Sequence, residues 1–311
     1  MKNLDINFPI DNFEKLIIDI GWESLDDWFN FWNNQKNILS IDQYWRNKVK
    51  DDWIWGLALP LLSMAYKFKN NFSDRKIIGI SALPGTGKTT LGKWLEATSL
   101  KLNFKIAVIS IDDFYLPSDE MKLALNNNPW NVSRGFPGSH SVDLMHEKLL
   151  KWKINGELNV PVFDKSLRNG LGDRSHWRVD KPDLLIIEGW FLGIEPLNTY
   201  EQINSADLSP YESIYRVKIQ KNLCKYLDVW SLIDNIWHLK PLEFEYMNIW
   251  KINQEKEMFL QKGTALQDEK LSNFLRMLNV SIPQKSFDLI KSHTLLLIDQ
   301  ERNLVEARLN L

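Results

Sequence analysis

The sequence predicts an α/β fold with a doubly wound parallel sheet, preceded by a helical N-terminal segment and followed by a helical lid. Three observations predict it. Short apolar runs rich in β-branched residues alternate with stretches of helical periodicity from about residue 76 onward. A glycine-rich turn follows the first of these runs. The first 69 residues show helical periodicity without such runs. This alternation is typical of parallel strands joined by helical crossovers.

Composition excludes several classes of protein. The chain has 311 residues, of which 44% are hydrophobic and 25% charged, so it is expected to be globular and neither disordered nor fibrous. Its 38 lysines and arginines against 40 aspartates and glutamates give a formal charge of −2. Because this balance supplies no overall field for a polyanion, we expect no nucleic-acid partner.

The sequence also predicts a cytoplasmic location. The one cysteine, Cys224, has no partner for an intramolecular disulfide, and the first residues include acids where a signal peptide would need an apolar run. The longest apolar candidate, Ile54–Leu62, is short and is interrupted by Gly56 and Pro60. It falls below the roughly 18 residues that a membrane span needs, so we expect no membrane partner.

The N-terminal segment, residues 1–72, is predicted to be helical and to lead into a second unit, residues 73–311, through the polar stretch Lys69–Arg75. Its apolar residues recur at helical spacing, as in Trp22, Leu25, Trp28, Phe29 and Trp32. Such a stripe predicts buried indole rings that pack against the sheet unit or one another. The alternative is that Trp28 or Trp32 stays exposed and marks a dimer or partner contact.

The second unit begins the strand and helix alternation. Four apolar runs are predicted as parallel strands buried on both faces: Ile77–Ile80, Ile106–Ile111, Val160–Phe163 and Leu184–Ile187. Helices are predicted between them, at Thr89–Lys101 and Val142–Trp152. Later elements are a strand near Ile233–Leu239, a long helix from Leu242 to about Lys262, and a hairpin of Leu295–Ile298 with Leu304–Ala307.

The strongest motif is the turn Ala82-Leu-Pro-Gly-Thr-Gly-Lys-Thr89, between the first predicted strand and helix. This is where nucleotide-binding proteins carry a phosphate-binding P-loop, so the predicted sheet is of the P-loop NTPase type, with Ala82 in place of the first glycine. We expect Lys88 to reach the β- and γ-phosphates of ATP and the Thr89 hydroxyl to ligate Mg²⁺. Nucleotide contacts are expected from Gly85, Thr86, Gly87, Lys88, Thr89 and Thr90. The alternative is a glycine-rich turn with no ligand.

Carboxylates follow two of the predicted strands. Asp112 and Asp113 come directly after one strand, and Glu188 ends another. Carboxyl ends of parallel strands meet at the edge of the sheet where ligands bind. A carboxylate there can accept a proton from an attacking hydroxyl or hold magnesium, and Glu188 is our candidate metal carboxylate. The alternative for an aspartate at a strand end is a helix N-cap.

Two loops combine cations with glycines: Ser133–His140 and Phe163–Arg174. Arginine holds a small carboxylate or phosphate in a bidentate manner, and glycine lets the backbone approach it closely. The expected substrate-binding residues are Asp113, Tyr115, Arg134, His140, Lys165 and Arg174. The alternative is a pair of solvated loops with incidental charge. Lys251, in the long predicted helix, is the candidate cation of a lid that covers the transferring phosphoryl group.

These segments together resemble the D-glycerate 3-kinases of plants and cyanobacteria, within the P-loop kinases that include uridine kinase, phosphoribulokinase and bacterial pantothenate kinase. The wider resemblance lies in the P-loop and in Ser110-Ile-Asp-Asp-Phe-Tyr115. The narrower one lies in the two cationic loops, in Ile187-Glu-Gly-Trp-Phe-Leu-Gly193 and in Trp250–Glu255. Three departures are Lys251 where the family has an arginine, Lys262–Asp268 where the family's methionine is missing, and Phe136 where it has a small polar residue.

The resemblance implies an ATP- and Mg²⁺-dependent kinase that phosphorylates a primary hydroxyl of a small hydroxy acid, D-glycerate, to give 3-phosphoglycerate. The family's catalytic aspartate falls on Asp112, and Lys88 is the other expected catalytic residue. Two alternatives remain open at this point: a kinase for another small alcohol, such as a nucleoside or pantothenate, and a nucleotide-binding regulatory or scaffold protein without turnover. A nucleic-acid ATPase is disfavoured by the charge balance.

Overall fold

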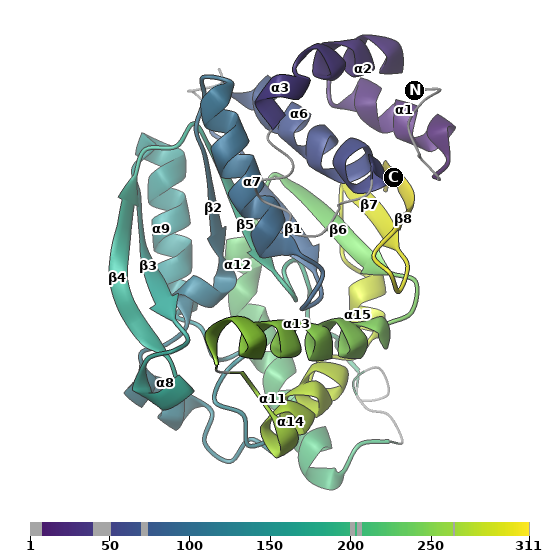
Figure 1. Ribbon diagram of the computed structural model, residues 1–311. Coiled ribbons are helices and arrows are strands. Elements are labelled where there is room, and N and C mark those ends of the chain that lie inside the picture. The colour runs from purple at the N-terminus through teal and green to yellow at the C-terminus, as the bar shows by residue number, and fades with distance from the viewer. Residues whose placement is uncertain are drawn as a thin grey trace.

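A six-stranded, mostly parallel sheet organises the protein, as the computed structural model shows (Figure 1). The structure describes residues 8–39, 51–69, 74–199, 203, 207–263 and 265–310. The strand order is β2-β5-β1-β6-β7-β8, with bounds β1 Ile77–Ala82, β2 Ile106–Ser110, β5 Leu184–Gly189, β6 Asn235–Pro241, β7 Thr294–Ile298 and β8 Leu304–Leu309. The predicted α/β sheet is confirmed. The predicted hairpin is also confirmed as β7 and β8, which pair antiparallel at one edge.

The buried centre of the sheet explains why its strands are continuous apolar runs. Strand β1 lies between β5 and β6 and all six of its residues are buried. In this register Ile80 pairs with Glu188 of β5, so the end of β1 lies beside that carboxylate. The carboxyl ends of β1, β2, β5 and β6 therefore meet at one edge of the sheet.

One predicted strand belongs to a different sheet. Strand β3 (Leu158–Asp164), expected as a parallel strand, pairs antiparallel with β4 (Asp173–Asp180) in a separate two-stranded ribbon. The prediction of a strand buried on both faces was wrong because only alternate positions of β3 are fully buried along most of its length. Strand β4 is polar and half exposed, so it carries no apolar run that sequence inspection could find.

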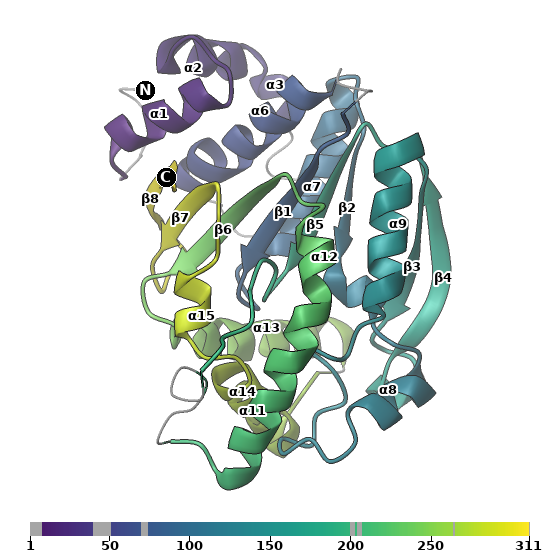
Figure 2. The ribbon, with the colours of Figure 1, turned by 180° about the vertical axis from the view of Figure 1, so that it is seen from behind.

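Helices cover both faces of the sheet. Helices α7 (Lys88–Lys101) and α6 (Leu59–Phe68) cover one face, and α9 (Val142–Asn155), α12 (Leu227–Trp230) and α15 (Lys285–Asp288) cover the other (Figures 1 and 2). Beyond the carboxyl edge lie α13 (Tyr246–Lys262), α14 (Asp268–Val280) and α11 (Pro210–Leu223), and α8 (Ser118–Ala124) flanks the ribbon. Helix α13 begins four residues later than the predicted start at Leu242.

The N-terminal helices and a π-helical turn share one core with the sheet. They are α1 (Ile10–Asp19), α2 (Leu25–Asn34), α3 (Lys36–Leu39), α5 (Asp51–Trp53) and the turn Ile54–Ala58. Trp28 and Trp32 are buried, and both indole N–H groups donate to the Ser63 hydroxyl at 2.7 Å. Trp94 of α7 donates to the Leu39 carbonyl at 2.7 Å. The predicted aromatic packing is therefore confirmed. Trp45, part of the predicted linker and the boundary at residue 72 lie outside the described residues.

Within the ranges of the chain described above, no helix combines the length and apolarity needed to cross a membrane.

Candidate active site

The turn between β1 and α7 has the backbone of a phosphate-binding loop. Gly85 and Gly87 have φ of +81° and +100°, a region that glycine enters without steric cost. Gly87 is the N-cap of α7, which begins at Lys88. The loop therefore delivers the helix N-terminus and its free N–H groups to one point, as anion binding requires. Thr89, the expected magnesium ligand, is exposed at the start of the helix.

The Lys88 ammonium is folded back onto this loop. Its Nζ donates to the carbonyl oxygens of Ala82 at 2.6 Å and Leu83 at 3.0 Å. Burial lowers the pKa of Lys88, and the nearby carboxylates of Glu188 and Asp112 partly oppose this effect. A phosphate bound in the loop would offer the ammonium a charged acceptor in place of two neutral carbonyls, and charge-assisted bonds are the stronger ones.

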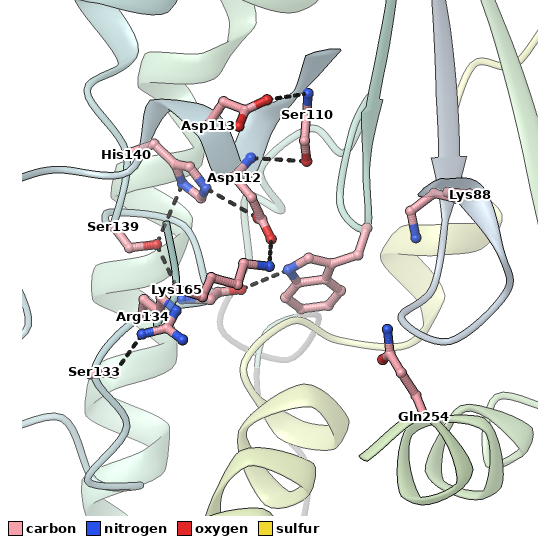
Figure 3. Close-up of polar contacts among 12 residues, drawn as sticks. Lys88, Ser110, Asp112, Asp113, Ser133, Arg134, Ser139, His140, Lys165 and Gln254 are labelled. Carbon is pink, nitrogen blue, oxygen red and sulfur yellow. Dashed lines mark hydrogen bonds and ion pairs between the residues drawn. The ribbon is translucent and has the colours of Figure 1, made fainter. Parts of the chain in front are cut away.

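Helix α13 lies directly against the P-loop. A Cβ built on Gly85 would fall 2.8 Å from the carbonyl carbon of Trp250, and one built on Gly87 would lie 4.0 Å from the Trp53 indole. Gln254 of the same helix points toward the loop beside Lys88 (Figure 3). The predicted lid helix and a tryptophan of the N-terminal segment thus both border the phosphate-binding turn.

The two aspartates after β2 have different positions. The backbone N–H of Ser110 donates to Asp113 at 2.9 Å, while the N–H of Asp112 donates to the Ser110 hydroxyl at 3.2 Å. Asp113 therefore caps the 3₁₀ turn Ile111–Phe114 and faces away from Asp112 (Figure 3). The structure gives Asp113 the capping role that was the alternative, and its binding of substrate stays a prediction.

Asp112 is the carboxylate at the centre of the site. Lys165 Nζ donates to its Oδ2 at 2.8 Å, and His140 Nε2 lies 3.9 Å from its Oδ1 (Figure 3). Burial raises the pKa of Asp112, but the Lys165 ammonium and the His140 ring outweigh this effect and hold the pKa well below its usual range. Asp112 is therefore ionised at neutral pH, as a proton acceptor must be.

Glu188 is the second carboxylate at the edge of the sheet. It ends β5 and pairs in register with Ser110 of β2 on one side and Ile80 of β1 on the other. Burial raises its pKa, while the charge of Lys88 and a hydrogen bond from the Ser110 hydroxyl lower it. Glu188 thus shares an environment with Lys88, on the side of the P-loop where a phosphate-bound cation would lie.

The predicted substrate arginines are engaged with protein groups. Arg134 Nη1 donates to the carbonyls of Gly170 at 3.0 Å and Leu171 at 2.7 Å, so it ties the two cationic loops together. Arg174 donates to the Tyr115 carbonyl at 3.2 Å and to the Ser141 hydroxyl at 2.6 Å. Arg174 thus joins β4 to the loop that carries His140, and its role as a substrate ligand stays a prediction.

His140 and Tyr115 form one wall of the site. Their rings are stacked, with centroids 4.5 Å apart, and both residues are buried. Burial lowers the pKa of His140 despite the opposing charge of Asp112, so the ring is neutral at neutral pH. Burial raises the pKa of Tyr115 well above its usual value. Phe136, unusual in the sequence, is fully buried and packs edge-to-face on Trp130 and Tyr215.

Lys251, the predicted lid cation, is paired within its own helix. Its Nζ contacts the buried carboxylate of Glu255, one turn along α13, and lies 5.1 Å from the Phe274 ring centre. A second cation beside α13 was missed by sequence reasoning. Arg302, from the β7–β8 loop, is 5.7 Å from the ring centre of Trp250, and its buried Nε has no hydrogen-bond partner among the described residues. Only the position of a distant loop brings it there, so no local signal in the sequence could identify it.

The donor set at this edge suits ATP with magnesium. Hydroxyl and carboxylate oxygens are available from Thr89, Glu188 and Asp112, which are the ligand types that Mg²⁺ prefers. Across the described ranges, no cluster of three or more histidine, cysteine or acidic residues could hold a metal ion alone. An Mg²⁺ bound here would accordingly share its coordination with nucleotide phosphates and water, as it does in other phosphotransferases.

Comparison with known proteins assigns the chain to a family. An uncharacterized kinase of Schizosaccharomyces pombe is 31% identical over 225 residues, which cover 68% of this chain and 80% of that kinase. Chloroplastic D-glycerate 3-kinase of Arabidopsis thaliana is 32% identical over 212 residues, 64% of this chain but 45% of the plant enzyme. The chain belongs to the P-loop kinase family that includes D-glycerate 3-kinase. This P-loop kinase is ATP-dependent.

The fold of this P-loop kinase is shared with a solved structure. The structure of D-glycerate 3-kinase from Cryptococcus neoformans superposes with a TM-score of 0.67 at 23% identity, over 80% of this chain and 99% of that one. No protein-family profile matches the chain.

Proposed function

We propose that this kinase phosphorylates a hydroxyl of a small hydroxy acid, and that the acceptor is D-glycerate, converted to 3-phosphoglycerate. The observation that carries the proposal is the ion pair of Lys165 with Asp112, at 2.8 Å, beside the P-loop. The names of the plant relative and of the fungal structure agree with this acceptor.

The proposed chemistry uses the residues at the edge of the sheet. The P-loop N–H groups and Lys88 hold the β- and γ-phosphates, and Asp112 takes the proton of the attacking hydroxyl. The hydroxyl oxygen forms a bond to the γ-phosphorus while the bond to the bridging oxygen breaks, and ADP leaves. Bound Mg²⁺, held by Thr89 and Glu188 together with the phosphates, supplies charge neutralisation. Most of the acceleration is expected from positioning and charge stabilisation.

The ion pair favours an anionic acceptor. An incoming hydroxyl that approaches Asp112 Oδ2 meets the Lys165 ammonium there. The lysine side chain is 57% exposed and can turn away, but its ammonium then needs a new anionic partner. A hydroxy acid supplies one in its own carboxylate, whereas a neutral alcohol does not. Arg134 lies close enough to Lys165 to lower its pKa, and it can add to the same anion-binding pocket.

The test is ADP release with a panel of acceptors: D-glycerate, glycerol, pantothenate and a nucleoside. Glycerol is the matched control because it keeps the hydroxyls of glycerate and lacks the carboxylate. We expect turnover with D-glycerate and at least about a hundredfold lower kcat/KM with glycerol, equivalent to the loss of one charge-assisted contact and the pairing of Lys165. Lys88→Ala protein, prepared in parallel, reports any contaminating kinase.

Preference for the nucleoside or for pantothenate would replace D-glycerate as the acceptor and keep the kinase assignment. Equal rates with glycerol would overturn the role of Lys165. ATP binding without ADP release for any acceptor would instead support a nucleotide-binding protein without turnover.

A further inference from the structure

Behind His140 lies a short chain of hydrogen bonds that the proposed reaction does not use. The backbone N–H of Gly138 lies 3.2 Å from the Tyr226 hydroxyl, to which it donates. That hydroxyl lies 2.8 Å from His140 Nδ1. Tyr226 comes from the 3₁₀ turn Cys224–Tyr226 between α11 and α12, so residues far apart in the sequence meet at this point.

Counting donors and acceptors fixes the direction of the chain. Tyr226 is fully buried, and burial raises its pKa far above neutrality, so the hydroxyl keeps its proton. Its oxygen already accepts the Gly138 N–H, and the described residues offer His140 Nδ1 as the one acceptor in reach for its proton. Ser139 cannot replace it as donor, because its hydroxyl is directed to the Phe136 carbonyl at 2.6 Å. The Nδ1 atom of His140 is therefore unprotonated, and the proton of the neutral ring is on Nε2.

The Nε2–H group is directed at the base. Among the described residues, Nε2 is buried with no hydrogen-bond partner, and the nearest acidic oxygen is Asp112 Oδ1 at 3.9 Å. This distance is too long for a hydrogen bond, so the Nε2–H group does not donate to Asp112 in this structure. We propose that Tyr226 is a positioning residue that fixes His140 as the Nε2–H tautomer, so that this N–H can orient the Asp112 carboxylate once Lys165 has turned to the acceptor. The inference rests on the proposed function of Asp112.

The surroundings keep the chain rigid. A Cβ on Gly138 would fall 2.3 Å from Asn222 of α11, and φ at Gly138 is +108°, so the backbone at this donor admits only glycine. The Tyr226 ring stacks on Trp230 with centroids 5.5 Å apart. Tyr115 stacks on His140 in the same way. Packing therefore holds the rings of both Tyr226 and His140 in place.

The test reads the tautomer in the resting protein. Long-range ¹H–¹⁵N spectra of protein labelled at its five histidines distinguish a protonated ring nitrogen from a bare one. We expect His140 to show a bare Nδ1 and a protonated Nε2, and its signals to be assigned by their loss in His140→Gln. In Tyr226→Phe the donor to Nδ1 is gone, so Nδ1 is expected to gain proton occupancy by bonding to the Ser139 hydroxyl oxygen, 3.4 Å away.

Tyr215→Phe is the matched control, because Tyr215 is also buried but its hydroxyl finds no hydrogen-bond partner in the described part of the chain. Its spectrum is expected to match that of the wild type. A protonated Nδ1 in the wild-type protein, or Tyr226→Phe spectra equal to those of Tyr215→Phe, would overturn the tautomer. These spectra are recorded without a phosphoryl acceptor, so their result holds even if D-glycerate is not the substrate.

Turnover then separates positioning from packing. With an acceptor that is phosphorylated, Tyr226→Phe is expected to lower kcat about tenfold, the effect of one neutral hydrogen bond, with the KM for ATP unchanged. Tyr215→Phe is expected to keep the wild-type kcat. A changed tautomer with wild-type kcat would overturn the positioning role, and no turnover by any of the proteins would contradict the proposed function while leaving the tautomer result in place.

Discussion

Lys165 Nζ lies 2.8 Å from Asp112 Oδ2, and the lysine side chain is 57% exposed while that of the aspartate is 26% exposed. The pair has two opposite effects on the proposed reaction. The ammonium keeps Asp112 ionised, and it also occupies one of the two oxygens that can accept the proton of the acceptor hydroxyl. A mobile lysine on a fixed carboxylate reconciles them, because the acceptor can displace the lysine without changing the charge of the base.

The Lys165→Met variant is expected to raise the pKa of Asp112, because burial alone raises that pKa and the lysine is the largest influence that lowers it. A base works only when deprotonated, so activity is present above this pKa and is lost as the pH falls through it. The acidic limb of kcat/KM for D-glycerate should therefore move to higher pH in the variant. Profiles from about pH 4 to about pH 8 bracket the ordinary aspartate and histidine ranges.

Lys181→Met is the control for Lys165→Met. Lys181 is exposed and pairs with Glu157 at 3.6 Å, away from the site. Its variant should keep the wild-type acidic limb. If Lys165→Met lowers kcat/KM equally at every pH, the lysine binds the acceptor without setting the charge of Asp112.

Asp112→Asn should lose turnover by roughly 100- to 10,000-fold, the range of general-base catalysis, while ATP affinity changes little. The amide keeps the shape of the side chain but accepts no proton. Calorimetric titration with ATP and a coupled ADP assay measure the two quantities separately. Asp113→Ala is the contrasting variant: it removes a helix cap, so a stability loss of about 1 kcal/mol is expected rather than a collapse of kcat. Wild-type turnover in Asp112→Asn would sink the assignment of the base.

The parts of the site that could be predicted from sequence are those encoded locally. The P-loop is one strand, one turn and one helix start in continuous sequence, so its spacing alone indicates the geometry later seen at Gly85, Gly87 and Lys88. The buried tryptophans of the N-terminal helices follow from helical period in the same way. Asp112 was also found locally, at the end of a strand, although spacing could not separate it from Asp113.

The parts that could not be predicted depend on contacts between distant segments. Strand β4 has no apolar run because only its pairing with β3 makes it a strand. Tyr226 is 86 residues from His140, and nothing in its own neighbourhood indicates a partner. Arg174 lies in a cation-rich loop typical of anion binding, yet its guanidinium is used by the Tyr115 carbonyl and Ser141. Tertiary packing determines these strand and hydrogen-bond partners, and residue type and spacing do not predict them.

Gly85→Ala should disturb both the P-loop and the lid. Alanine at φ +81° is strained by about 1–2 kcal/mol, and its methyl group would also meet the backbone of Trp250 at 2.8 Å. Since backbone cannot yield as a flexible side chain can, α13 must shift. We expect ATP affinity to fall at least tenfold and the melting temperature to drop, measured by titration and by thermal unfolding.

Gly263→Ala is the control that separates backbone strain from the contact with Trp250 in Gly85→Ala. Gly263 ends α13 with φ +71°, and a Cβ there would meet no atom within 4 Å. Its alanine variant should therefore show the backbone strain alone, with ATP affinity near that of the wild type. Equal loss of ATP affinity in both variants would mean that the contact between Gly85 and Trp250 does not matter for nucleotide binding.

Ser63→Ala should destabilise the protein by about 2–4 kcal/mol, because it leaves the buried indole N–H groups of Trp28 and Trp32 without their shared acceptor. Ser63 lies on α6, which shares a core with the sheet, so the loss falls on the contact that holds α2 against α6. Ser231→Ala is the control: its exposed hydroxyl donates to the Asp228 carbonyl, much as Ser63 donates to Leu59, but accepts no indole, so a change within about 0.5 kcal/mol is expected. Denaturant unfolding measures both. Equal, small losses in the two variants would show that the paired indole bonds contribute little, and that apolar burial alone holds α2 against α6.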